Sequence, residues 1–278
     1  TAKFLGFDLS TTALAIGVRG AKRNEDFVST PMQGQITWRK QPAFDLGFIP
    51  KMILIILKKL RKRGWGFSNI GALSFSIRQH DMVILNKRNE FLIPALSWQC
   101  HIAKKEVIKL KQLGAEQIVG DIKERFILPK LMWALKKSPC LRKKIYRVMT
   151  TGDFIGFMMT GIPRLSTSDG LSNALLDQKN KSFAGKIIKM AGLEPNWFPD
   201  IIQSGESLGI DHPNPEANSD WNRINSIFKG WNAVASLGDN HAGALGCGLK
   251  DFTTLVVSAG SSGTVNRLAH PSWKLRGQ

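Results

Sequence analysis

The stretch SLGDNHAGALGCG, residues 236–248, places a single carboxylate, Asp239, between two different local patterns. The apolar run before it, residues 233–237, predicts a strand, and the small residues after it predict a helix. A helix start offers backbone N–H groups without intrahelical partners and a partial positive charge, so a carboxylate there is expected to stay ionised and to point outward. Asp239 is therefore a candidate proton acceptor.

Two further turns are rich in small, hydroxyl-bearing residues. Residues 8–12 read DLSTT, an acid at the end of a strand-like run followed by a tight turn. Donors in such a turn can hold phosphate oxygens, and the carboxylate of Asp8 can hold Mg²⁺ through water. Residues 260–264 read GSSGT, where glycines allow a ligand to approach the backbone closely. Each segment alone is also typical of an ordinary turn, the first capped by its own side chains and the second closing a hairpin.

The order of apolar patterns predicts an α/β fold in which helices cover a sheet. Alternation predicts an N-terminal hairpin, a buried strand with a partner or continuation, and a last hairpin, over residues 3–8 with 13–18, 69–77 with 82–85, and 253–259 with 263–268. Helical period and helix punctuation predict helices over residues 44–60, 101–119, 129–137, 141–148, 153–160, 183–191 and 216–228.

The chain of 278 residues carries 39 Lys and Arg against 21 Asp and Glu, a net charge of +18. A basic surface favours polyanions, yet the cations are spread along the sequence, and the densest run, residues 58–63, is typical of a solvated helix end. We therefore expect no specific nucleic-acid partner. No apolar run approaches the roughly 20 residues of a membrane span, and residues 1–3 lack a secretion signal. Three scattered cysteines give no zinc or redox spacing, so a cytoplasmic location is expected.

Taken in order, these segments resemble the FGGY carbohydrate kinases, a family within the actin/hexokinase-like ATPase superfamily. Residues 8–12 and 260–263 are similar to the two phosphate motifs of that family, and GDNHAGA, residues 238–244, is similar to the segment that carries its catalytic aspartate. SIRQH, residues 76–80, occupies the place of a segment that marks xylulose kinases. The match continues through residues 92–98, 124–126, 129–133, 160–161, 168–169 and 204–206.

The resemblance implies a ribonuclease H-like α/β fold, with a mixed sheet flanked by helices and an incomplete second lobe. Residues 1–248 would form the sugar-binding lobe, and residues 249–278 would form the first hairpin of the nucleotide lobe. Family members continue with a second lobe of comparable size that supplies the adenine pocket. The chain is therefore expected to bind ATP weakly at best and to expose a face that is normally covered, so a homodimer is a possible arrangement.

The implied reaction transfers the γ-phosphoryl group of ATP, with Mg²⁺, to a sugar hydroxyl, and D-xylulose is the expected acceptor. The resemblance implies that Asp239 is the general base and that Asp8 positions Mg²⁺ through water. The residues that would orient the sugar hydroxyls are Gln79, His80, Arg125, Asp239 and Asn240. Those that would hold the phosphates are Ser10, Thr11, Thr12, Gly260, Ser261, Ser262 and Gly263.

The sequence departs from the xylulose kinase pattern around His80. Ile77 and Asp81 stand where the pattern has glycines, Arg78 replaces a glutamine, and Cys100 stands where many members have an aspartate. These exchanges put the shape of the sugar loop in question. A kinase for another sugar or polyol (a hexonate, glycerol or ribulose) and a non-catalytic sugar-binding remnant therefore stay open as alternatives. The charge of +18 leaves a third alternative, a nucleic-acid-associated protein.

Overall fold

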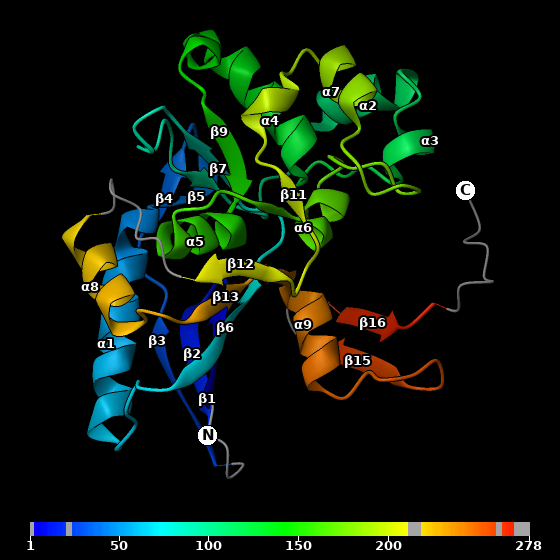
Figure 1. Cartoon of the computed structure of the whole chain (residues 1–278). Helices are drawn as coiled ribbons and strands as arrows, with labels where there is room; N and C mark the ends of the chain where they lie inside the picture. Colours follow the sequence, from blue (N-terminus) through cyan, green and yellow to red (C-terminus); the bar gives the residue numbers. More distant parts are fainter. Residues whose placement is uncertain (1–2, 21–23, 211–217, 260–262, 270–278) are drawn as a thin grey trace.

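The computed structural model of the chain describes residues 3–20, 24–210, 218–259 and 263–269. Within these residues, two main sheets and their helices form a lower and an upper part, as Figure 1 shows. The buried apolar side chains divide into two clusters, one centred on each sheet, so the fold has two cores.

The lower part is built on a mixed seven-stranded sheet in the order β12-β13-β6-β1-β2-β3, with β14 also paired to β6. β1, β2 and β3 form an antiparallel meander, which confirms the predicted N-terminal hairpin, whereas β6 runs parallel to β1, β13 and β14. The strands are β1 (Lys3–Leu9), β2 (Ala13–Arg19), β3 (Glu25–Pro31), β6 (Ile70–Ile77), β12 (Ser207–Ile210), β13 (Asn232–Val234) and β14 (Leu237–Gly238).

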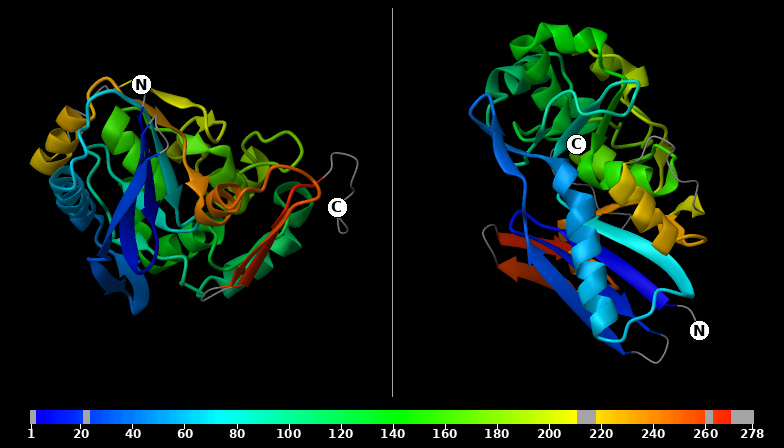
Figure 2. Two further views of the ribbon diagram at one scale, coloured as in Figure 1. Left: turned by 90° about the horizontal axis from the view of Figure 1, so that it is seen from below. Right: turned by 90° about the vertical axis from the view of Figure 1, so that its left-hand side faces the viewer.

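One face of this sheet is covered by helices and the other is open. Successive strand residues point to opposite faces, and on β1 Leu5, Phe7 and Leu9 are buried while Phe4 and Asp8 are exposed. The covering helices are α1 (Ile49–Lys62), α5 (Thr151–Thr160) and α8 (Ser219–Ile227). Figure 2 (right) shows α1 and α8 side by side in front of the sheet, in agreement with their contacts. α5 is buried along its whole length because it lies between the two sheets.

The upper part contains a five-stranded antiparallel sheet in the order β4-β5-β8-β7-β9. Its strands are β4 (Gln35–Trp38), β5 (Gln41–Phe44), β7 (Met82–Leu85), β8 (Ala95–Leu96) and β9 (Arg147–Thr150). The surrounding elements are η1 (Leu46–Phe48), α2 (Lys104–Gln112), α3 (Glu116–Val119), α4 (Ile127–Lys137), η2 (Pro139–Lys143), β10 (Leu165–Ser166), α6 (Thr167–Ser172), α7 (Gly185–Met190), η3 (Pro195–Trp197) and β11 (Ile201–Ile202).

Several predicted elements are corrected by the structure. Residues 82–85 neither pair with β6 nor continue it, because the turn at 78–81 carries the chain into the other sheet as β7. Residues 141–148 are not a continuous helix: η2 ends at Lys143, and β9 begins at Arg147, where the chain pairs with β7. The predicted helix over 101–119 breaks into α2 and α3 near Gly114, whose φ is +72°. The helix predicted from residue 44 begins at Ile49, since Phe44 ends β5.

The remaining elements are α9 (Asp239–Gly246), β15 (Leu255–Ala259) and β16 (Gly263–Arg267). β15 and β16 form the predicted last hairpin, which projects beside α9 in Figure 1. It exposes more than half of the surface of Leu255, Val257 and Val265. The division of the chain at residue 248 and the homodimer stay predictions. No helix in the described ranges is long and apolar enough to cross a bilayer.

Candidate active site

Three parallel strands end at one edge of the lower sheet, and each brings a polar group there. In the register of β6, Ser76 lies beside Asp8 of β1 on one side and beside Leu237 of β14 on the other. Asp8 and Asp239 therefore lie on either side of β6, at the same end of the sheet. The strand ends thus unite two segments that lie far apart in the sequence.

Asp239 is the first residue of α9 and is partly buried. Its Oδ1 accepts the backbone N–H of Asn240 at 2.8 Å. Burial, with help from the nearby Asp8 and Asp81, raises the pKa of Asp239 above its ordinary value. A raised pKa makes the carboxylate a better proton acceptor than a fully solvated one. Asp8 is exposed, and one of its oxygens accepts the Ser76 hydroxyl at 3.0 Å.

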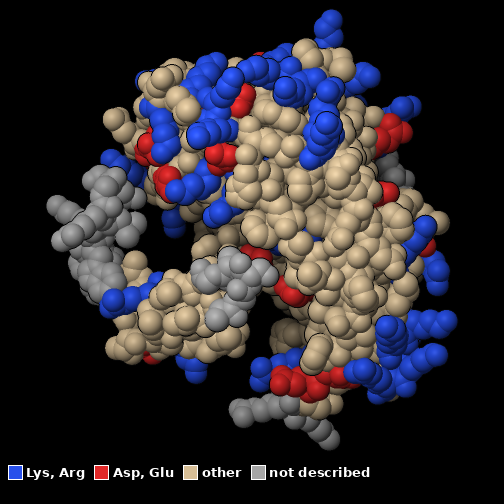
Figure 3. All heavy atoms as spheres, turned by 180° about the vertical axis from the view of Figure 1, so that it is seen from behind, with Lys and Arg blue, Asp and Glu red and all other residues tan. Residues whose placement is uncertain are grey.

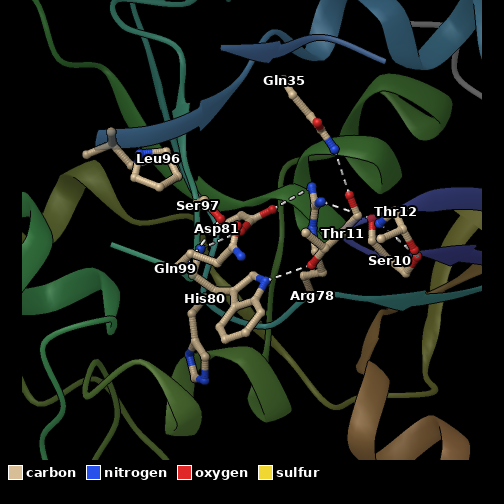
Figure 4. Close-up of polar contacts among 12 residues, drawn as sticks. Ser10, Thr11, Thr12, Gln35, Arg78, His80, Asp81, Leu96, Ser97 and Gln99 are labelled. Carbon is tan, nitrogen blue, oxygen red and sulfur yellow. Dashed lines mark hydrogen bonds and ion pairs between the residues drawn. The ribbon is translucent and has the colours of Figure 1, made fainter. Parts of the chain in front are cut away.

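The turn after β1 is held by its own hydroxyls and by the upper part of the molecule. Ser10 Oγ accepts the N–H groups of Thr12 and Ala13, as a self-capped turn does. Trp98 Nε1 donates to Thr11 Oγ1 at 2.9 Å (Figure 4). The side chain of Thr12 is left exposed. Of the three hydroxyls, that of Thr12 is therefore the most accessible to a ligand.

The exchanges around His80 form a buried ion pair instead of disrupting the loop. Arg78 Nη2 lies 2.7 Å from Asp81 Oδ2, and both side chains are almost fully buried. The Arg78 guanidinium stacks over Phe44, 4.0 Å from the ring centroid, and Nη1 donates to the carbonyl of Ser10 at 2.9 Å. Asp81 Oδ1 accepts the N–H of Trp98 (Figure 4). The pair therefore connects the loop at residues 78–81 with the turn after β1 and with the segment that carries Trp98.

His80 is fixed by Asn173, a residue that the sequence analysis did not single out. Asn173 Nδ2 donates to the carbonyls of Gln79 and Asp169, so its Oδ1 is the atom that faces His80 Nδ1 at 3.2 Å. Nδ1 must then carry the proton, and the tautomer leaves Nε2 as an acceptor. Burial lowers the pKa of His80 to about 3, so the ring is neutral at physiological pH. The ring also stacks on Phe126.

Gln79 lies between the loop and Asp239, and its amide nitrogen is bound within the protein. Nε2 donates to Ser172 Oγ at 2.9 Å and to His241 Nδ1 at 3.3 Å. A Cβ at Gly238 would come within 2.1 Å of Gln79 Cδ, so only glycine allows this approach. Gln79 therefore connects α6 to the start of α9.

For the other predicted site residues the structure gives fewer contacts. Arg125 lies close enough to affect His80 electrostatically, and its Nε is buried without a hydrogen-bond partner among the residues that the structure describes. Asn240 is exposed beside Asp239. Gly263 begins β16, whereas Gly260, Ser261 and Ser262 lie outside the described residues.

Residues 22–246 match the family described as the FGGY family of carbohydrate kinases, N-terminal domain. The chain belongs to this family. A xylulose kinase of Lactococcus lactis is 23% identical over 273 residues, which cover 94% of this chain and 52% of that protein. A xylulose kinase of Staphylococcus xylosus is 26% identical over 201 residues, which cover 70% of this chain and 40% of that protein. The chain thus spans about half the length of the curated relatives it matches.

Solved structures show the same fold. The xylulose kinase of Rhodospirillum rubrum superposes with a TM-score of 0.84 at 17% identity, covering 95% of this chain and 54% of that one. The glycerol kinase of Plasmodium falciparum with ADP gives a TM-score of 0.81 at 12% identity, with the same coverage. The chain therefore has the α/β fold of an FGGY N-terminal domain, and kinases named for different acceptors share this fold.

A buried lysine stabilises the loop that carries His80 in this FGGY domain. Lys130, on α4, is inaccessible to solvent, and its Nζ donates to the carbonyls of His80, Leu96 and Ser97. Burial lowers the pKa of Lys130 to about 8. Sequence gave no signal for this role, because the three carbonyls lie 33 to 50 residues away along the chain.

A second pair of carboxylates, Asp153 and Asp169, lies in the interior of the FGGY domain. The hydroxyls of Thr150 and Ser236 each lie within 3.2 Å of an oxygen of both acids. Burial raises the pKa of Asp153 to about 6, and burial together with the charge of Asp153 raises that of Asp169 further. Burial therefore favours the protonated form of both carboxyls relative to a solvated carboxyl. Ser236 immediately precedes β14, and Asp239 follows it. The hydrogen bonds of Ser236 to the two acids therefore hold in place the backbone that leads to Asp239.

The groove beside α9 has a volume of about 620 Å³, which is within the usual range for small-molecule sites. Ser168, Ser172, Leu237 and His241 are among its lining residues, whereas Asp8, His80 and Asp239 are not, so the groove adjoins the two carboxylates without containing them. In the described part of the chain no three His, Cys, Asp or Glu side chains gather as metal ligands. Mg²⁺ commonly binds through one or two carboxylates with waters and substrate phosphates, and the exposed Asp8 fits that mode.

Proposed function

We propose that this chain is the acceptor-binding half of an ATP-dependent sugar kinase and that its acceptor is D-xylulose. In this proposal residues 1–248 form the sugar-binding lobe, and residues 249–278 belong to the nucleotide lobe. The observation that carries the proposal is the convergence of Asp8, the Ser10–Thr12 turn and Asp239 at one edge of the lower sheet. The xylulose kinase relatives support the choice of sugar.

The geometry suits an in-line phosphoryl transfer, in which most of the rate comes from positioning and charge neutralisation. The sugar hydroxyl loses its proton to the carboxylate of Asp239 as its oxygen bonds to the γ-phosphorus, and the bond from that phosphorus to the β–γ bridging oxygen breaks to release ADP. When bound, Mg²⁺ would neutralise phosphate charge, and Asp8 would hold it through water. Ser10, Thr11, Thr12 and residues 260–263 would hold the phosphates.

His80, Gln79, Arg125 and Asn240 would orient the sugar. His80 Nε2 is an acceptor in the tautomer that Asn173 imposes, so it would receive a hydrogen bond from a sugar hydroxyl. Arg125 Nε, buried and without a hydrogen-bond partner in the described ranges, would donate one. Together with Asp239 these groups supply the mixture of donors and acceptors that a polyol requires.

The second candidate function is sugar binding without phosphoryl transfer. It is favoured by one observation: the groups around His80 are held firmly by Asn173 and by the buried pair of Arg78 and Asp81, whereas Asp239 has only the N–H of Asn240 as a hydrogen-bond partner within the described part of the chain. This candidate keeps His80, Arg125 and Asn240 as sugar contacts but assigns no catalytic step to Asp239.

A thermal-shift panel separates these candidates. D-xylulose, D-ribulose, D-gluconate and glycerol are each added with and without Mg-ATP, and the melting temperature and ADP release are measured. Ligands that bind the folded state raise the melting temperature. We expect D-xylulose to give the largest shift and to trigger ADP release. A shift without ADP release would support the second candidate, and no shift with any sugar would contradict both.

A further inference from the structure

Apart from Arg125, the Lys and Arg residues of the chain have no role in the proposed phosphoryl transfer, and half of the net charge lies in one segment. Residues 104–147 carry 13 Lys and Arg against 4 Asp and Glu, which gives +9 of the total +18. Figure 3 shows Lys and Arg side chains gathered over the upper part of the molecule, with a second group on the lower part. This concentration exceeds what the capping of helix ends requires.

Within that region a crevice of about 440 Å³ separates α2, the end of α4, η2 and the loop after α7. Its apolar floor is formed in part by Met132, Leu135 and Leu193. Its cationic lining consists of Lys105, Lys109, Lys136 and Arg142, and Glu106 is the one acid among the lining residues. The lining therefore combines an apolar surface with a net charge of +3.

The cations are only partly neutralised by the protein. Lys136 Nζ lies 4.0 Å from the buried carboxylate of Glu106. Among the described residues, Lys105, Lys109 and Arg142 have no carboxylate within ion-pair distance. Arg142 is also held in place: Nη2 donates to the Gly192 carbonyl at 2.7 Å, and the guanidinium lies over Trp197. Its other nitrogens remain available to a ligand.

We propose that this crevice binds a small organic phosphate, distinct from the acceptor and nucleotide of the kinase site. The phosphate group is held by Lys105, Lys109 and Arg142, because a guanidinium fork matches phosphate geometry and two ammonium groups add charge. The apolar or aromatic body of the ligand packs on Met132, Leu135 and Leu193. The volume of the crevice is that of a typical small-molecule site.

The test uses a fluorescent AMP that carries a methylanthraniloyl group, titrated into the chain and followed by anisotropy. The double variant Lys105→Ala/Lys109→Ala removes two exposed cations from the crevice, and Lys58→Ala/Lys59→Ala removes the same charge from α1 as the matched control. We expect about tenfold weaker binding for the first pair and less than about twofold for the second, since each removed contact is charge-assisted. Both variants should melt within a few degrees of the unmodified chain.

Two further measurements identify the site and the group recognised. Methylanthraniloyl-adenosine, which lacks the phosphate, should bind the unmodified chain at least about tenfold more weakly. Asp239→Asn, in the proposed kinase site, should bind the fluorescent AMP as the unmodified chain does. The inference is wrong if the two double variants lose affinity equally, if neither loses it, if the neutral analogue binds equally well, or if only Asp239→Asn loses affinity.

Discussion

The two pairs of carboxylates in this domain differ in what surrounds them. Asp8 and Asp239 stand at the edge of a sheet, where Asp8 is exposed and Asp239 is partly buried. Asp153 and Asp169 are buried beneath the same edge and share the hydroxyls of Thr150 and Ser236. An acid at the edge can exchange its proton with a substrate, whereas burial of the interior pair raises the pKa of both acids and makes their protonation part of the folding equilibrium.

The largest expected effect tests the edge pair. Asp239→Asn should lower D-xylulose-dependent ADP release by about 10² to 10⁴-fold, because the hydroxyl loses its proton acceptor. A coupled assay for ADP with Mg-ATP checks this. Ser226→Ala, at an exposed position on α8, is the control and should keep the parent rate. Undiminished ADP release by Asp239→Asn would remove Asp239 from the chemistry.

The next effect tests the interior pair through pH. The pKa of Asp153 is about 6 in the folded chain, so the folded state keeps a proton that the unfolded state loses near pH 4. The free energy of unfolding should therefore fall as pH rises through the window from about 4 to 6, by about 3 kcal/mol. Asp153→Asn, which cannot ionise, should flatten this decline in urea titrations.

Asp251 provides the control of opposite sign for the pH experiment. Its pKa is lowered by hydrogen bonds from Thr253 and Thr254, so its contribution to stability is present above its unfolded pKa and is lost as pH falls. Asp251→Asn must therefore leave the decline above pH 4 at least as steep. Equal flattening by both substitutions would show that the interior pair does not cause it.

A smaller effect tests the contact that connects the two regions. Gly238→Ala places a methyl group against Gln79 and should cost about 1–3 kcal/mol of unfolding free energy. In a Gln79→Ala background the same change should cost clearly less, because the methyl group then has space. A double-mutant cycle in urea measures the difference. Equal costs in both backgrounds would mean that Gln79 does not fill the space beside Gly238.

The smallest expected effect concerns His80, whose contribution to D-xylulose affinity should hardly change with pH. Because its pKa is lowered to about 3, the ring stays neutral from pH 5 to 8, and its contribution to D-xylulose affinity should be constant there. Calorimetry at several pH values should find His80→Phe weaker than the parent by a similar factor at each pH. A factor that grows as pH rises through 6 would show that His80 titrates in the ordinary range.

Sequence singled out Asp8 and Asp239, which the structure brings to one edge of the lower sheet, but it did not indicate that Asp153 and Asp169 pair in the interior. Asp8 and Asp239 each end an apolar run beside small residues, a local pattern that a single segment displays. Asp153 and Asp169 are polar residues in a segment read as a helix and its following loop, and their partners come from β9 and from Ser236, up to 83 residues away. No local period records such contacts. The same holds for Asn173 and Lys130.

The secondary-structure prediction was wrong where the tertiary environment of a segment, and not its own sequence, decides between helix and strand. The run that forms β9 has three buried residues after Arg147, too few for its period to separate helix from strand, and pairing with β7 makes it a strand. Between β6 and β7 the chain passes from one sheet to the other at residues 78–81. The period of the sequence did not predict this passage, because the turn is held by a buried contact between Arg78 and Asp81. Exchanges that sequence comparison treated as departures thus hold the turn together.

The parallel pairing of β14 with β6 has a consequence for biosynthesis. Strands β1 and β6 can meet once about 80 residues have left the ribosome, but the acid beside them is residue 239. A nascent chain that pauses before residue 239 can already bring His80 and Asn173 together. In that chain β14 has not yet paired with β6, so the unpaired backbone groups of β6 can bind a strand of another protein. Chaperone capture during synthesis should therefore be strongest just before residue 239 emerges.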